Sequence, residues 1–276
     1  MKVLAGRAAL VTGGARGIGR AIAEMLVREG VAVALADIDL ATAQATADAL
    51  RRPGCDVAAY ALDVREPEGW AQVVAAMGDR LGPPTILVNN AGIMSLGSLT
   101  DQPRDADRRQ LDINVVGVIE GMRAVLPTMR RLGQGHIVNI ASVAGKVGIP
   151  HAAVYSATKF AVAGLTDAVR HEERGRGIAF TTVHPSLVQT ELIAGTGRPR
   201  FPPPATVEQV ADAVREALLH EHVHVYVPRI GRLAALAPAW LGRRLSERVG
   251  RLLGMDTMFA TVDAGRAAYR ARTERS

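Results

Sequence analysis

Residues 8–19 read AALVTGGARGIG, an apolar run that ends in a glycine-rich turn. A stretch of helical period, Ile18–Glu29, begins inside that turn. In such a strand–turn–helix unit the glycines let the backbone approach a pyrophosphate closely, and the helix N-terminus offers N–H groups and a favourable dipole to the anion. The stretch therefore predicts a dinucleotide-binding fold, with the spacing T-G-x-x-x-G-x-G in place of G-x-G-x-x-G.

Apolar runs alternate with stretches of helical period as far as residue 228. The apolar runs are Ala8–Val11, Val31–Ala36, Val57–Ala61, Thr85–Val88, His136–Ile140, Ile178–Val183 and His222–Val227. Between them lie Ile18–Glu29, Leu40–Arg51, Glu68–Leu81, Asp105–Arg131, Ala152–Glu173 and Val207–His220. Nearly continuous apolar runs are typical of parallel strands that helices cover on both faces. The pattern predicts one α/β domain over residues 1–228, a Rossmann-type doubly wound parallel sheet of about seven strands.

Composition excludes several classes of protein. The chain has 276 residues and one cysteine, Cys55, so no intrachain disulfide, cysteine-based zinc site or other metal site is expected. The formal net charge of +6 arises from residue 229 onward, where ten arginines face four acids; residues 1–228 carry 23 basic and 23 acidic side chains. A neutral body with a basic tail is not typical of a nucleic-acid-binding domain, so no nucleic-acid partner is predicted.

Two segments depart from the alternating pattern. Residues 190–206 are rich in glycine and proline and long for a connection, which predicts a substrate loop. Residues 229–276 predict a basic amphipathic C-terminal helical extension. Its apolar side has Leu233, Leu236, Trp240, Leu241, Leu245, Val249, Leu252 and Leu253, and its basic side has Arg243, Arg244, Arg248 and Arg251. Two roles stay open for it: packing over the substrate loop or a neighbouring subunit, or peripheral attachment to anionic lipid. Without an N-terminal apolar segment, we expect a cytoplasmic protein.

Asp37 and Arg16 favour different cofactors. Asp37 ends the second apolar run, 18 residues after Gly19. A carboxylate there can accept hydrogen bonds from both adenosine ribose hydroxyls and repels a 2′-phosphate, while Asp39 is expected to cap the next helix. Arg16 favours NADP, because a guanidinium beside the turn can hold that phosphate. We expect the carboxylate to dominate, so NAD is the predicted cofactor.

Tyr155 and Lys159 stand four positions apart on one face of a predicted helix. Because tyrosine titrates near pH ~10, we expect the ammonium to lower the pKa of Tyr155 toward the range where acid–base catalysis is efficient. Ser142 follows the run His136–Ile140, and polar or glycine residues such as Asp63 and Asn90 follow other runs. The carboxyl ends of parallel strands line the ligand crevice of a doubly wound sheet. These residues therefore predict an active site at that edge.

In combination these motifs resemble the short-chain dehydrogenase/reductase family, in its subtype of about 250 residues. The resemblance covers Leu4 to about Val227. The cofactor residues expected on this basis are Gly13, Arg16, Gly17, Ile18, Gly19, Asp37, Asp63, Val64, Asn90, Ala91, Gly92, Tyr155, Lys159, Pro185, Val188 and Thr190. The implied catalytic residues are Asn114, Ser142, Tyr155 and Lys159. The chain departs from the family pattern at Ser186, where glycine is usual.

The resemblance implies hydride transfer between a carbinol carbon and nicotinamide C4. Tyr155 is then the general base in oxidation and the general acid in reduction. Lys159 lowers the pKa of Tyr155 and binds the nicotinamide ribose, Ser142 binds the substrate oxygen, and Asn114 holds a relay water. Val188 and Thr190 are expected at the nicotinamide carboxamide.

The substrate predicted is a hydrophobic secondary alcohol or ketone, because the pocket candidates are apolar by family position. They are Met94, Ala144, Val147, Ile149, Leu187, Leu192 and Ile193. An NADP-dependent carbonyl reductase that relies on Arg16 is the alternative, and a non-catalytic dinucleotide sensor is less favoured. The resemblance also implies a homodimer or homotetramer, with the helices over 105–131 and 152–173 at the main interface.

Overall fold

The computed structural model describes residues 3–197 and 204–233, and in the remaining tail residues 235, 242, 244, 245, 248, 259, 266, 269, 271 and 273. Its centre is a seven-stranded sheet in the order β3-β2-β1-β4-β5-β6-β7, with every neighbouring pair parallel. The strands are β1 (Ala8–Thr12), β2 (Ala32–Asp37), β3 (Val57–Ala61), β4 (Ile86–Asn89), β5 (Gly135–Ile140), β6 (Ile178–Pro185) and β7 (His224–Val227). The doubly wound fold predicted from the sequence is confirmed.

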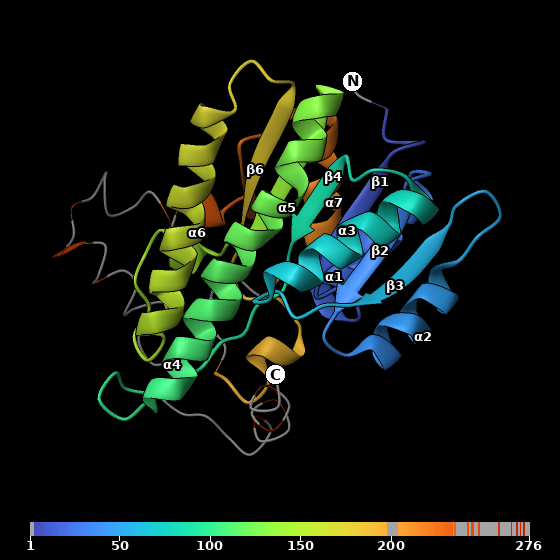
Figure 1. Ribbon diagram of the computed structural model, residues 1–276. Coiled ribbons are helices and arrows are strands. Elements are labelled where there is room, and N and C mark those ends of the chain that lie inside the picture. Colours follow the sequence, from blue (N-terminus) through green and yellow to red (C-terminus); the bar gives the residue numbers. More distant parts are fainter. Residues whose placement is uncertain are drawn as a thin grey trace.

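Helices cover both faces of the sheet, as Figure 1 shows. The α-helices are α1 (Gly17–Arg28), α2 (Leu40–Leu50), α3 (Pro67–Leu81), α4 (Arg104–Leu111), α5 (Gly117–Leu132), α6 (Ala153–Glu172) and α7 (Val207–His220). Side chains of α1, α2 and α7 bury one face of the sheet, for example Leu26 and Val214. Side chains of α3, α5 and α6 bury the other, for example Trp70, Val125 and Val162. Burial on both faces explains why the strand segments are almost continuously apolar.

Strand order reverses between β1 and β4. From β1 the chain adds β2 and β3 on one side, and then returns to pair β4 with β1 and builds the other half of the sheet. The connections after β1 and β4 therefore diverge and leave a crevice at the carboxyl edge of the sheet. The glycine-rich turn lies at this crevice, with Gly13 at φ +60° and Gly17 at φ +54°, values that glycine adopts at little cost.

The helix expected over 105–131 is interrupted. A π-helical turn, η1 (Asp112–Val116), lies between α4 and α5. Inside it the Asn114 amide bonds both backbone groups of Ile93: Oδ1 accepts from the N–H at 2.8 Å, and Nδ2 donates to the carbonyl at 2.9 Å. Nδ2 also lies 3.1 Å from Thr158 Oγ1 on α6. Single π turns are frequent at functional sites, and this one fixes the direction of Asn114.

The predicted amphipathic extension lies largely outside the described residues. Of its apolar side, Leu233 and Leu245 are described, and both are exposed. Phe259, Arg266 and Tyr269 are described as well, and all three are buried. Within the part of the chain that the structure describes, no helix combines the length and the apolar character needed to cross a bilayer.

Candidate active site

A cavity of about 960 Å³ opens at the carboxyl edge of the sheet. The residues expected at the cofactor line it: Gly13, Arg16, Gly17, Ile18, Asp37, Asp63, Val64, Asn90, Ala91, Gly92, Tyr155, Lys159, Pro185, Val188 and Thr190. Gly19 lies outside this lining, because its place is inside the turn, where an added Cβ would lie 2.2 Å from the Gly13 carbonyl oxygen. Two short 3₁₀ turns, η2 (Val143–Gly145) and η3 (Glu191–Ile193), complete the rim.

The turn after β1 is tied to the segment after β4. Thr12 Oγ1 accepts the backbone N–H groups of Asn90 at 3.0 Å and Ala91 at 3.1 Å. In return Asn90 Nδ2 donates to the carbonyl of Thr12 at 3.0 Å and of Gly13 at 3.1 Å. A Cβ at Gly13 would come within 3.0 Å of Ala91 Cα, so only glycine fits at that distance without displacing the backbone. The two crevice walls are thereby held at a fixed separation.

Asp37 and Arg16 face the end of the cavity where β2 ends. The Asp37 carboxylate accepts the N–H of Ala15 at 3.1 Å and of Asp39 at 3.1 Å. Arg16 pairs with Asp39 at 2.5 Å (Nη2 to Oδ2) and lies 4.0 Å from Glu191 (Nη1 to Oε2). Asp39 also accepts the N–H of Thr42 at 3.1 Å, so its predicted capping role is confirmed. The positive charge of Arg16 is thus partly compensated within the chain.

Asp63 is held by a residue that the sequence did not single out. Arg65 Nε lies 2.8 Å from Asp63 Oδ1 and 3.0 Å from Oδ2, and the Arg65 N–H donates to Oδ1 at 3.0 Å. Burial raises the pKa of Asp63, but the hydrogen bonds from Arg65 outweigh it and the net pKa lies below the ordinary value. The carboxylate therefore stays ionised and fixed beside Val64, which lines the same cavity.

Tyr155 and Lys159 lie on α6 with both side chains buried. Lys159 Nζ is 5.7 Å from the centroid of the Tyr155 ring and donates to the Ile140 carbonyl at 2.9 Å. Burial lowers the pKa of Lys159 to about 8. The expected lowering of the Tyr155 pKa is wrong for this structure: burial raises the pKa of Tyr155, and hydrogen bonding with Ser142 opposes that rise in part. Loss of hydration and the charge interaction with Tyr269 together outweigh the hydrogen bond with Ser142.

Ser142 lies where β5 and β6 end together. Its Oγ donates to the Pro185 carbonyl at 3.3 Å and accepts the N–H of Ala144 at 3.1 Å, which caps η2. Asn114 lies outside the cavity lining and behind Gly92, at which a Cβ would be 3.1 Å from Asn114 Oδ1 and 3.7 Å from Lys159 Nζ. Glycine at this position therefore keeps Asn114 and Lys159 close to each other.

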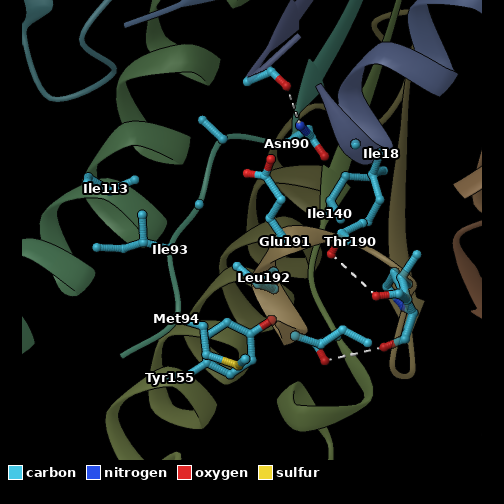
Figure 2. Close-up of a pocket in the computed structure, with 18 of the residues that line it drawn as sticks. Ile18, Asn90, Ile93, Met94, Ile113, Ile140, Tyr155, Thr190, Glu191 and Leu192 are labelled. Carbon is cyan, nitrogen blue, oxygen red and sulfur yellow. Dashed lines mark hydrogen bonds between the residues drawn. The ribbon is translucent and has the colours of Figure 1, made fainter. Parts of the chain in front are cut away.

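Apolar side chains form the substrate end of the cavity. The predicted residues that line it are Met94, Ala144, Ile149, Leu187, Leu192 and Ile193; Val147 lies outside the lining. Figure 2 shows Met94 against Tyr155, and both belong to one buried cluster that includes Phe259. Phe259, Tyr269 and Thr273 also line the cavity. The sequence did not single out these three, because they follow Tyr155 by more than 100 positions and match no motif.

The sequence profile of the short chain dehydrogenase family matches residues 7–199. The chain belongs to the short-chain dehydrogenase family. Within it, the chain is 40% identical over 190 residues to a 3-alpha-(or 20-beta)-hydroxysteroid dehydrogenase of Mycobacterium bovis, covering 68% of this chain and 72% of that protein. It is 42% identical over 189 residues to a sorbitol dehydrogenase of Cereibacter sphaeroides, covering 68% and 73%.

Solved structures of this family have the same fold. A short-chain dehydrogenase/reductase from Burkholderia phymatum in complex with NAD superposes with a TM-score of 0.79 at 26% identity, covering 88% of this chain and 98% of that one. The predicted enzyme class of this short-chain dehydrogenase, an NAD(P)-dependent oxidoreductase acting on CH–OH groups, is confirmed.

Proposed function

We propose that this short-chain dehydrogenase transfers a hydride between NAD(H) and a hydrophobic secondary alcohol or ketone. The observation that carries the proposal is the position of Ser142, Tyr155 and Lys159 in one cavity with a glycine-rich dinucleotide turn at one end and an apolar cluster at the other. Polar groups that converge in a largely apolar pocket are typical of a site that orients a small uncharged substrate.

The residues of the crevice fit a dinucleotide. Gly13 and Gly17 adopt positive φ at the N-terminus of α1, where backbone N–H groups and the helix dipole favour a pyrophosphate. Since they line the same cavity, we assign Asp37 to the adenosine ribose, Asp63 and Val64 to the adenine, and Lys159 to the nicotinamide ribose. When bound, the nicotinamide supplies the hydride donor or acceptor.

The chain's own residues supply the proton transfer. Tyr155 gives a proton to the carbonyl oxygen in reduction and takes the hydroxyl proton in oxidation, while Ser142 donates a hydrogen bond to the same oxygen. The ordinary pKa of tyrosine, about 10, lies well above neutral pH and burial raises it further, so Tyr155 is protonated in the nucleotide-free protein, which is the form that a general acid requires. In this proposal Lys159, with a pKa of about 8, and the neighbouring Asn114 return a proton from solvent through a bridging water; their common contact with Gly92 supports this role.

The Tyr155→Phe variant tests these roles. Loss of the phenolic oxygen removes the acid–base group and leaves the ring in place, so we expect turnover to fall at least 1,000-fold, in line with the upper part of the range for general acid–base catalysis. NADH binding should stay within about threefold of wild type. Turnover is followed by NADH absorbance over a panel of secondary alcohols and ketones. Tyr60→Phe, whose hydroxyl donates weakly to the Ala76 carbonyl at 3.4 Å far from the cavity, is the matched control. Retention of more than a few per cent of the rate would contradict the assignment.

Charge near the adenosine ribose supports NAD over NADP. The Asp37 carboxylate lines the cavity beside the glycine-rich turn, and the pairing of Arg16 with Asp39 reduces the charge left for a 2′-phosphate. A relative from Thermococcus sibiricus, 26% identical with a TM-score of 0.73 over 80% of this chain and 95% of that one, was solved with 5-hydroxy-NADP, so the fold accepts either form. An NADP-dependent carbonyl reductase is therefore the second candidate, favoured by the position of Arg16.

Nucleotide titration of the Asp37→Ala variant decides between the two cofactors. We expect wild-type protein to bind NADH more tightly than NADPH, and the variant to lose at least tenfold of that preference, equivalent to about 1.4 kcal/mol. Asp48→Ala, which removes an exposed carboxylate from α2, is the matched control. Tighter binding of NADPH by the wild-type protein would overturn the proposal for NAD.

The oligomeric state, the membrane contact and the cellular location of the enzyme stay predictions. Exposed Leu111, Val116 and Phe160 support a homodimer or homotetramer that uses the helices over 105–131 and 152–173. Exposed Leu233 and Leu245 agree with a peripheral membrane contact of the extension. A cytoplasmic location is the prediction from the sequence.

A further inference from the structure

A buried arginine from the carboxyl-terminal segment connects two walls of the substrate cavity. Arg266 is 1% exposed, and its Nη1 donates to the Leu192 carbonyl at 2.8 Å and to the Ala194 carbonyl at 3.4 Å. Its Nη2 donates to the Met94 carbonyl. A buried guanidinium is costly unless its N–H groups are bonded. These three carbonyls therefore stabilise the buried position of Arg266, and Arg266 in turn fixes the backbone that carries them.

Tyr269 completes the attachment. The N–H of Met94 donates to Tyr269 Oη at 2.8 Å, and the Arg266 guanidinium stacks on the Tyr269 ring at 4.6 Å from its centroid. Both backbone groups of Met94 are therefore bonded to the carboxyl-terminal segment. Three parts of the chain therefore meet at Met94: the segment that follows β4, the η3 loop and the carboxyl-terminal segment.

The rings that this attachment brings in are part of the cavity wall. Phe259 and Tyr269 are buried and line the cavity, and Phe259 shares an apolar cluster with Tyr155, Met94 and Leu96. A hydroxyl or charge pressed against such a wall would lose its hydration without a new partner. An apolar ring system has no hydrogen bonds to water to lose, and contact with the wall would remove its apolar surface from water, which is favourable.

We propose that Phe259, Arg266 and Tyr269 determine substrate specificity. Phe259 and Tyr269 close the end of the cavity opposite the cofactor turn, and Arg266 keeps them there by binding the backbone at Met94, Leu192 and Ala194. The cavity then selects an uncharged alicyclic alcohol or ketone whose ring fits between Tyr155 and Phe259, and it rejects open-chain polyols. This inference rests on the proposed function.

Substrate selectivity of Phe259→Ala tests the wall. The probes are cyclohexanol, decahydro-2-naphthol and sorbitol, with NAD as the cofactor. We expect the ratio of kcat/KM for the bicyclic over the monocyclic alcohol to rise at least tenfold in the variant, mainly through KM, because the shortened side chain leaves room for the second ring. Wild-type kcat/KM for cyclohexanol should exceed that for sorbitol at least 100-fold. A ratio within twofold of wild type, or a preference for sorbitol, would overturn the proposal.

Hydrogen exchange at the Met94 amide tests the attachment without any turnover. Tyr269→Phe removes the acceptor of that N–H, so exchange at Met94 should accelerate at least tenfold, while Tyr60→Phe should leave it unchanged. Arg266→Met should accelerate exchange at Met94 and raise KM for cyclohexanol at least fivefold with kcat within threefold; Arg28→Met, at an exposed ion pair, is the control. Unchanged exchange at Met94 in Tyr269→Phe would overturn the attachment.

If wild type turned over none of the three alcohols, the proposed function would fail, and the exchange result would still decide whether these residues close the cavity.

Discussion

Burial acts in opposite directions on the two titratable side chains of the active site. It raises the pKa of Tyr155 and lowers the pKa of Lys159 to about 8. Both shifts favour the neutral form, as expected where water is displaced. Because the unfolded chain keeps the lysine proton up to its ordinary pKa, it binds more protons than the folded chain above about pH 8, and the contribution of Lys159 to stability rises with pH in that range.

Lys159→Met is therefore expected to stabilise the nucleotide-free protein. The pKa of about 8 corresponds to a cost of roughly 3 kcal/mol at pH 7 and roughly 2 kcal/mol at pH 9 in the wild type. Loss of the hydrogen bond to the Ile140 carbonyl lowers the stability of the variant by about 1 kcal/mol. The net gain should be about 2 kcal/mol at pH 7 and about 1 kcal/mol at pH 9, measured by urea denaturation at both pH values.

Lys146→Met removes a half-buried lysine near the same edge and is the matched control for Lys159→Met. Equal or lower stability of the Lys159 variant at pH 7 would show that the folded protein does not bear the cost of a buried ammonium. Turnover of the Lys159 variant should be lost at both pH values, so stability and activity would change in opposite directions.

The sequence predicted that Tyr155 and Lys159 share a helix face at the cavity, but not the direction of the shift in the Tyr155 pKa. The spacing of Tyr155 and Lys159 on one helix face follows from the helical period and was predictable. Their depth of burial depends on side chains from β5, η2 and the carboxyl-terminal segment, which no local pattern reports. Arg65 escaped notice for a similar reason, since its bond to Asp63 depends on the backbone direction after β3.

At the scale of elements, the strands were predictable and the interruption of one helix was not. Each predicted run became a strand of the sheet because apolar residues on both faces identify a covered parallel strand. The π turn at Asp112–Val116 leaves the apolar pattern nearly unchanged, because it adds one residue to a turn. Its contacts are tertiary and therefore absent from a local pattern: the Asn114 amide bonds Ile93 and Thr158, which belong to other segments.

Gly121 on α5 gives an element-scale prediction. A Cβ there would lie 2.4 Å from Asn89 Oδ1 and 2.8 Å from Trp70 Cη2, so the close packing of α5 on β4 and α3 depends on glycine. Although alanine favours a helix by about 1 kcal/mol over glycine, Gly121→Ala should destabilise the protein by about 1–3 kcal/mol through overpacking. Urea denaturation measures the change.

Gly164→Ala on α6 is the matched control, because Gly164 is exposed and a Cβ there meets nothing within 4 Å. That substitution should stabilise the protein by about 0.5–1 kcal/mol. Stabilisation by both substitutions would mean that α5 can move away from the sheet at little cost.

At the scale of the whole molecule, an apolar strip remains exposed on the side of α4 and α6. Leu111 is 43% exposed, Val116 37% and Phe160 46%, and α4 and η1 both contact α6. Side chains of this size grouped on neighbouring helices are typical of an interface between subunits. Figure 1 shows α4 and α5 end to end, with α6 beside them on one side of the molecule.

Phe160→Glu tests this assembly. A charge on α6 at this exposed apolar position should reduce the mass in light scattering to a smaller assembly or a monomer, because an unpaired carboxylate is costly to bury. Leu40→Glu, at an equally exposed apolar position on α2, should leave the mass unchanged. A wild-type protein that is monomeric at micromolar concentration would refute the predicted oligomer.

The Met94 contacts join residues that are synthesised at different times. Met94 and Tyr269 are 175 positions apart, and the residues between them include β5, β6 and β7. On the ribosome the whole sheet and its nucleotide crevice emerge before Arg266 and Tyr269 do. If Arg266 and Tyr269 act as proposed, the nucleotide crevice is synthesised before the residues that select among alcohols, so substrate selectivity is the last property that the growing chain acquires.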